Sequence, residues 1–232
     1  MRYTPIAGAM AASLLGLAQP ALASGFVEDS KATLDTRNFY INQDNRSGDA
    51  APSYAEEWGQ GFLVARRLVE AGVRMVQINL RGWDTHQNAF RDLKSKLLPS
   101  IDHCLSGFLT DLEARGLLDE TLVIMCGEMG RTPRISPISP NGKNASGEPF
   151  TPGRHHWGDV FPCWFAGGGI QPGRVVGRTD AQGGVPVTDA YTPEDLAATI
   201  FHCLGIGPDR EFRDAGDRPY RVYRGRPIGA LL

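Results

Sequence analysis

The stretch "VRMVQINLRGWDTHQNAF", residues 73–90, decides the fold class of this chain. Its first eight residues, ending at Leu80, have the length and pattern of a buried β-strand. A short polar turn follows, and it carries Asp84 and His86. A helical pattern begins directly after the turn at Phe90. The turn is therefore predicted to join the carboxyl end of a strand to a helix.

The helix that follows extends this pattern to a strand–helix–strand unit. Apolar residues recur at steps of three and four from Leu93 to Leu112, which is the spacing of one helix face. We expect Pro99 to kink this helix and Gly116 to end it. A second apolar run, "TLVIMC" at 121–126, predicts another buried strand. Hydrophobic strands joined by a helix are typical of a covered parallel sheet, so the predicted fold class is α/β.

The rest of the chain supplies further elements of the same kind. The segment 54–72 has helical apolar spacing, with Gly72 as its stop. A second helix is predicted at 192–204, with Thr192 as its N-cap. Residues 131–158 are rich in Pro, Gly and Ser and predict a long loop, either functional or disordered. The remaining predicted strands are 31–42, 160–168 and the short 173–177.

Composition is ordinary for a globular protein and excludes several function classes. The chain has 232 residues, of which 41% are hydrophobic and 22% charged, and this suits one domain or one domain with a small appendage. Its net charge of −2 favours neither nucleic acid nor an acidic membrane surface as a partner. No run reaches the roughly 18 apolar residues that a transmembrane helix needs.

The first 23 residues have the three parts of a secretory signal peptide. Arg2 is the positive start, "PIAGAMAASLLGLAQ" is the apolar centre, and Ala21-Leu22-Ala23 is the cleavage signal. We therefore expect export to the periplasm or cell envelope of a Gram-negative bacterium; an apolar N-terminal helix is the alternative. Export permits disulfides, but spacing selects no pairing among the four cysteines. We interpret them as small buried hydrophobic residues.

Potential metal ligands lie next to three of the predicted strands. Asp84 and His86 come after the first buried strand, and Glu128 comes after the second. His155 and His156 precede the third. In open α/β sheets ligands bind beyond the carboxyl ends of the strands, so we expect these side chains at one edge. Carboxylate and imidazole groups suit zinc, manganese or iron, which predicts a divalent-metal site.

Each of these residues also has a plain structural interpretation. Asp84 can cap the next helix from an ordinary turn, and Glu128 can be a surface carboxylate. Arg131 either binds an anionic substrate or anchors its segment toward solvent. His103 and His202 lie within apolar helical patterns, so we expect them to pack rather than to bind.

From about Gly61 to the C-terminus, the chain resembles the bacterial family DUF 1501. The stretches that carry the resemblance are "ARRLVEAGVRMVQINLRGWDTHQNAF", "RGLLDETLVIMCGEMGRTPRI", "RHHWGDVFPCWFAGGGI" and "VTDAYTPEDLAATIFHCLGI". The family is placed in the alkaline phosphatase and sulfatase superfamily, whose members use metal ions and a Ser, Thr or formylglycine nucleophile to cleave phosphate or sulfate esters. The resemblance implies a partial alkaline-phosphatase-like parallel sheet with covering helices, and zinc, manganese or calcium as the ion.

The resemblance also assigns roles to particular residues. Asp84 and His86 match an aspartate and a histidine that bind one metal, and His156 matches the last histidine ligand. His155 replaces the usual aspartate of the family, which favours one metal over two. Arg131 and His155 are the weaker candidates, for contact with substrate. The metal ligands that the resemblance implies are Asp84, His86, Glu128 and His156.

Residues 1–62 instead resemble the start of an OprD-type outer-membrane porin. The leader, "GFVEDSKATLDTRNFYINQDNR" and "EEWGQGF" match its signal peptide, its first barrel strand and the start of its second strand. One or two strands cannot close a barrel. We therefore interpret the chain as a composite. Its predicted parts are a signal peptide at 1–23, a porin-like strand and loop at 24–60, and the C-terminal part of a phosphatase-like α/β domain at 61–232.

Three hypotheses for function follow. The first is an exported, metal-dependent hydrolase of phosphate or sulfate esters, acting on a small-molecule or glycan ester. We expect it to be incomplete and inactive as written, because the nucleophile belongs to a part of the family that this chain lacks. The second is a non-catalytic exported protein that binds a metal or a partner. The third is an outer-membrane porin fragment.

Overall fold

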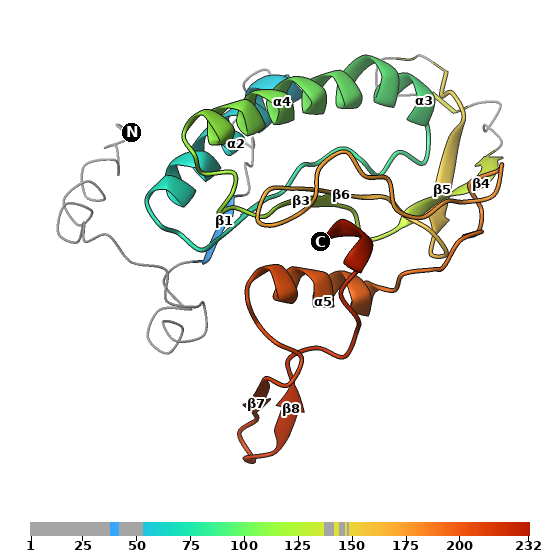
Figure 1. Cartoon of the computed structure of the whole chain (residues 1–232). Coiled ribbons are helices and arrows are strands. Elements are labelled where there is room, and N and C mark those ends of the chain that lie inside the picture. Colours follow the sequence, from blue (N-terminus) through green and yellow to red (C-terminus); the bar gives the residue numbers. More distant parts are fainter. Residues whose placement is uncertain (1–37, 42–52, 137–141, 144–146, 148) are drawn as a thin grey trace.

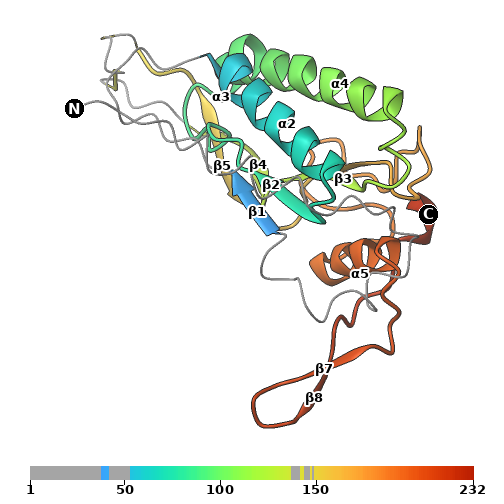
Figure 2. The same ribbon diagram turned by 90° about the vertical axis from the view of Figure 1, so that its left-hand side faces the viewer.

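The computed structural model describes residues 38–41, 53–136, 142–143, 147 and 149–232. The predicted signal peptide and most of the predicted porin-like segment lie outside these residues. The described chain is a mixed α/β fold, as its sequence predicted. In Figures 1 and 2 two long helices cover one side of the short strands, and a third helix lies on the opposite side. These helices are α2 (Tyr54–Glu70), α4 (Leu98–Ala114) and α5 (Pro193–Cys203).

The described strands pair two by two instead of forming one sheet. The one parallel pair is β1 (Asn38–Ile41) with β2 (Met75–Ile78). Three pairs are antiparallel: β3 (Val123–Cys126) with β6 (Cys163–Ala166), β4 (Gly130–Ser136) with β5 (Gly153–Trp157), and β7 (Glu211–Arg213) with β8 (Pro219–Arg221). The predicted parallel sheet is therefore wrong for β3 and β6. Parallel neighbours need a crossover, and between β3 and β6 the described chain forms the β4–β5 pair rather than a helix.

Two other strand predictions need correction. The segment 131–158, predicted as one long loop, contains most of β4 and all of β5. Pro133 and a register shift between Arg131 and Ile135 interrupt β4, and such a bulge hides the alternation by which strands are recognised. The segment 173–177, predicted as a short strand, contains no strand. Val175 there is 94% exposed.

The stretch "EEWGQGF", residues 56–62, lies within α2 and is not a barrel strand. Ser53 caps this helix, because its hydroxyl accepts the backbone N–H of Glu56 while the Glu56 carboxylate accepts the backbone N–H of Ser53. Trp58 and Phe62, one turn apart, are buried on the same face. The helix predicted over 54–72 is thus confirmed, and it crosses the predicted boundary between residues 60 and 61.

Helices α2 and α4 pack together over the main core. The rings of Phe62 and Phe108 lie 5.0 Å apart at this interface. A π-helical turn at Leu93–Leu97 directly precedes α4, and the kink at Pro99 stays a prediction. Pro99 sits in the first turn of α4, directly after the π-helical turn. The buried members of this core are Trp58, Phe62, Leu97, Ile101 and Cys104.

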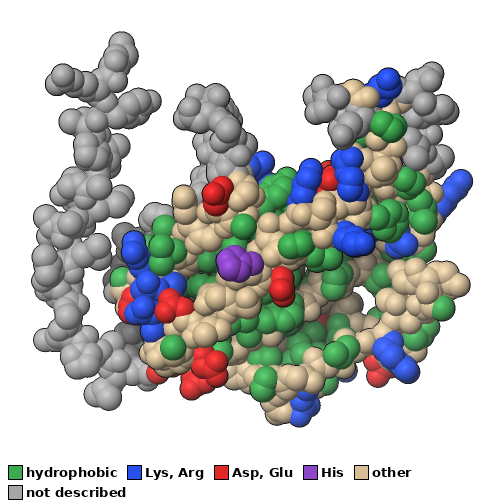
Figure 3. All heavy atoms as spheres, turned by 90° about the horizontal axis from the view of Figure 1, so that it is seen from above, with side chains coloured by type: hydrophobic (Ala, Val, Ile, Leu, Met, Phe, Trp, Pro, Cys, Tyr) green, Lys and Arg blue, Asp and Glu red, His purple; other side chains and the backbone are tan. Residues whose placement is uncertain are grey.

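Helix α5 begins as its sequence predicted, with Thr192 and Asp195 forming a capping box. A second, smaller core joins it to the C-terminal segment. His103 and His202 are exposed, so the prediction that they pack inside is wrong. Among the residues that the structure places, no helix combines the length and apolarity that crossing a bilayer requires. Figure 3 shows acidic and basic side chains interspersed with hydrophobic ones over α2 and α4.

Candidate metal site

The segment before Asp84 is fixed on helix α2. Arg81 donates to the buried Glu57 carboxylate, with its Nε 2.8 Å from Oε1. Trp83 stacks on the buried Trp58, with ring centroids 5.8 Å apart and an interplanar angle of 14°. An ion pair and an aromatic stack therefore hold this segment before the chain turns away from the helix. Asp84 projects from a fixed backbone for that reason.

The segment after Asp84 is fixed on strand β5. Asn88, in a left-handed conformation at φ 58°, donates its backbone N–H to the Thr151 carbonyl at 2.8 Å. Its side-chain oxygen accepts the Thr151 N–H at 2.7 Å. Gly153 passes so close that a Cβ there would lie 2.1 Å from the His86 carbonyl oxygen. Asn88, and not Asp84, is the N-cap residue of the short helix α3 (Ala89–Asp92), so the capping interpretation of Asp84 is wrong.

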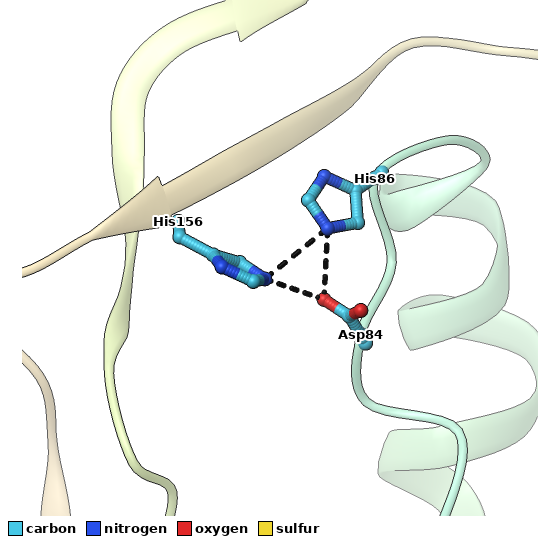
Figure 4. A group of neighbouring side chains, drawn as sticks. All are labelled: Asp84, His86 and His156. Carbon is cyan, nitrogen blue, oxygen red and sulfur yellow. Dashed lines mark hydrogen bonds and ion pairs between the residues drawn. The ribbon is translucent and has the colours of Figure 1, made fainter.

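Three ligand atoms converge where this loop meets β5 (Figure 4). The Asp84 Oδ1 lies 3.0 Å from the Nε2 of His86 and 2.8 Å from the Nε2 of His156. The two Nε2 atoms lie 3.1 Å apart. This is the one group of three or more potential ligands found among the described residues. Three of the four predicted metal ligands are thus brought together.

His155 lies against the other nitrogen of the central histidine. The Nδ1 atoms of His155 and His86 are 2.9 Å apart, so one of them donates and the other accepts. If neutral His86 donates from Nδ1, its Nε2 carries a lone pair that faces the Asp84 oxygen. A metal ion or the ring N–H of His156, whose Nε2 is 3.1 Å away, can then occupy that lone pair, and metal-bound histidines are commonly held by such a bond from their second nitrogen. The structure therefore places His155 behind a candidate ligand.

Arg131 is the cross-strand neighbour of His156 in the β4–β5 pair. Its guanidinium donates to Asp84 Oδ1 at 2.6 Å and to the Trp83 carbonyl at 3.0 Å. Hydrogen bonds from His156 and then from Arg131 lower the pKa of the Asp84 carboxyl to about 2. Asp84 is therefore ionised at any physiological pH. The interpretation of Arg131 as a solvent-facing anchor is wrong, because its side chain is only 27% exposed and points to the site.

Glu128 is placed differently from the other predicted ligands. It is exposed, in the bend between β3 and β4, and its carboxylate is not part of the converging group. Its role as a ligand stays a prediction.

The converging residues fit a small divalent ion. Ligand atoms around a tetrahedral zinc ion lie about 3.4 Å apart, given metal–ligand bonds of about 2.1 Å. The three observed separations, 2.8 to 3.1 Å, are slightly shorter, so a small outward movement accommodates an ion. The side chains of Asp84, His86 and His156 are 65%, 38% and 45% exposed, so one side of the group is open to solvent. An open side is what distinguishes catalytic from structural zinc sites.

Comparison with known proteins shows the family of the chain. The sequence model of the family described as "Protein of unknown function (DUF1501)" matches residues 18–232, so the chain belongs to this family. The match crosses the boundary predicted between a porin-like and a phosphatase-like part. A stretch of 43 residues is 56% identical to the Porin-like protein GalP of Pseudomonas putida, and it covers 18% of this chain and 10% of that protein. No solved structure matches the chain.

Proposed function

We propose that the chain binds one divalent metal ion through Asp84, His86 and His156, and that this site serves the hydrolysis of phosphate or sulfate esters. The convergence of one carboxylate oxygen and two imidazole nitrogens within 3.1 Å carries the proposal. Two imidazoles and one carboxylate form a three-ligand set that leaves a position free for substrate. Zinc and manganese suit these donors.

The roles of the protein groups follow from their contacts. A bound divalent ion supplies a Lewis acid that polarises an ester oxygen and stabilises the charge developing in the transition state. Arg131 adds a second positive charge beside Asp84, in a position fixed by the carbonyl oxygens of Trp83 and Arg154. A guanidinium group matches the geometry of phosphate and sulfate oxygens. His155 holds the ring of His86 in place.

Solvent water is the nucleophile in this reaction. Thr85, between two of the ligands in sequence, is buried, so its hydroxyl group is not offered to a substrate. Water reaches the group because the Asp84 side chain is 65% exposed. From the signal-peptide pattern alone, we also propose that the protein acts after export.

Metal content of the purified chain tests the proposal. After incubation with ZnCl₂ or MnCl₂ and removal of loosely held ions, mass spectrometry of the metals should find about one ion per chain. Asp84→Ala and His156→Ala should each lose it. His103→Ala, which removes an exposed histidine of α4, is the matched control and should keep it. Glu128→Ala distinguishes three ligands from four, because only a four-ligand site loses the ion in this variant.

Hydrolysis is assayed on the loaded chain with p-nitrophenyl phosphate and p-nitrophenyl sulfate. Release of p-nitrophenol that disappears in Arg131→Met while the metal stays bound would support the assigned role of Arg131. If the metal-loaded chain cleaves neither ester, the protein binds metal but does not have the proposed hydrolase activity. A folded wild-type chain that holds no ion would remove both parts of the proposal.

A further inference from the structure

Cys126 and Cys163 are directly opposite one another in the antiparallel β3–β6 pair. Opposite residues in such a pair have Cα atoms about 4.5 to 5.5 Å apart, which lies inside the range of about 4.4 to 6.8 Å that a disulfide spans. Both residues are free cysteines, and the Cys126 thiol is close enough to contribute to the raised pKa of Cys163. The backbone therefore already holds the two sulfur atoms in reach of a covalent bond.

The two thiols of this pair differ in accessibility. Cys126, the last residue of β3, is exposed, which contradicts the prediction that all four cysteines are buried. Cys163 is half-buried, and this burial, together with the neighbouring Cys126, raises the pKa of its thiol to about 11. Cys104, by contrast, is buried under α2 and donates its thiol to the Ala55 carbonyl. An oxidant in solvent therefore meets Cys126 first.

We propose that Cys126 and Cys163 form a reversible intramolecular disulfide by exchange with a small organic disulfide. The Cys126 thiolate attacks one sulfur of that disulfide, forms a mixed disulfide and releases one small thiolate. The Cys163 thiolate then attacks the Cys126 sulfur, and the second small thiolate leaves. The pair gives up two electrons and two protons, and the small disulfide is reduced to two thiols.

This bond would tie together the base of the segment that carries β4 and β5. Arg131 and His156 both belong to that segment, so the bond would restrict the part of the chain that holds them. Closing a loop of this length should raise the melting temperature by on the order of 10 °C. The disulfide depends only on the β3–β6 register and the two thiols, whether or not the site binds metal.

The pair can be tested by tryptic mapping of the full chain. Reduced protein is incubated with oxidised glutathione, its remaining thiols are alkylated, and it is digested without reduction. Residues 116–131 and 155–174 are tryptic peptides with one cysteine each, so their linked mass identifies the bond. We expect that linked peptide in the wild type and in the control Cys203→Ser. It should be absent from Cys126→Ser and Cys163→Ala, and in both the melting temperature should no longer respond to glutathione.

Two results would overturn the proposal. One is wild-type protein whose peptides 116–131 and 155–174 remain unlinked, each free or carrying glutathione. The other is a linked peptide that forms only after the chain has been unfolded in urea, since the folded strands would then not direct the pairing. The rate of the second exchange step, in which Cys163 attacks the mixed disulfide at Cys126, provides a second readout. This rate should rise about tenfold per pH unit through neutral pH, because the fraction of Cys163 present as thiolate grows.

Discussion

Gly153→Ala should disturb the candidate metal site without changing any ligand. A Cβ at this position would lie 2.1 Å from the His86 carbonyl oxygen and 2.7 Å from the backbone nitrogen of Gln87. Both contacts are to backbone, so no side-chain rotation relieves them, and strand and loop must separate by about 0.9 Å to restore a 3.0 Å contact. Binding sites tolerate about 0.5 Å of misplacement, so zinc affinity should fall by roughly 10- to 100-fold. Overpacking should also destabilise the fold by about 1 to 3 kcal/mol, or about 3 to 10 °C.

Zinc titration calorimetry and thermal melting would measure both effects. Gly158→Ala is the matched control, because it adds the same methyl group just beyond β5 at a position where nothing lies within 4 Å. If the wild type binds zinc and both variants bind it equally well, the close approach of β5 to the loop does not position the ligands. If the wild type itself binds no zinc, the proposed function fails and the packing argument rests on the melting curves alone.

Three further predictions concern the parts of the fold that support the site. Arg81→Ala should lower the free energy of unfolding by about 3 kcal/mol in urea titration, because the buried Glu57 loses its ion pair; a change below about 1 kcal/mol would contradict this. Thr199→Val keeps the shape but leaves the Ile228 N–H unbonded, so it should cost about 1 to 3 kcal/mol, and an unchanged melting curve would refute it. The pKa of Asp195 is lowered chiefly by a hydrogen bond from the backbone N–H of Arg226. The ionised carboxylate therefore stabilises the fold above about pH 4, and this stabilisation is lost as the pH falls through the lowered pKa. Asp195→Asn should therefore flatten the acid side of the stability curve, and identical slopes for both proteins would count against the assignment.

The elements that the sequence predicted well are those whose signals are local. The capping box of Thr192 and Asp195 lies within four residues, and the stop at Gly116 needs only one residue at φ 67°. Strand direction is not local. The partner of β3 is β6, and the β4–β5 pair lies between them, so the choice between parallel and antiparallel pairing depends on residues far apart in the chain. A strand–helix–strand pattern cannot supply that information.

The same difference explains what could be predicted of the site. Asp84 and His86 follow a strand directly, and His156 lies in a short histidine pair, so all three stand out in the sequence. The part played by Arg131 depends on its register opposite His156, within a segment predicted as a loop. The role of Gly153 could not be predicted from the sequence around it, because it depends on the close approach of the His86 backbone. His86 and His156, which meet at this place, are 70 positions apart in the sequence.

Charge then bears on the kind of substrate that the site would accept. The ligand group contributes a single negative charge, since Asp84 is its only carboxylate and remains ionised down to a pKa of about 2. Arg131 already contributes one positive charge to that same oxygen. A divalent ion would therefore leave the group with a net positive charge on a side that is open to water. Such a site attracts and orients anions, whereas a neutral ester would leave the excess charge unbalanced. If the site binds a metal ion, the placement of Arg131 thus favours anionic substrates over neutral ones.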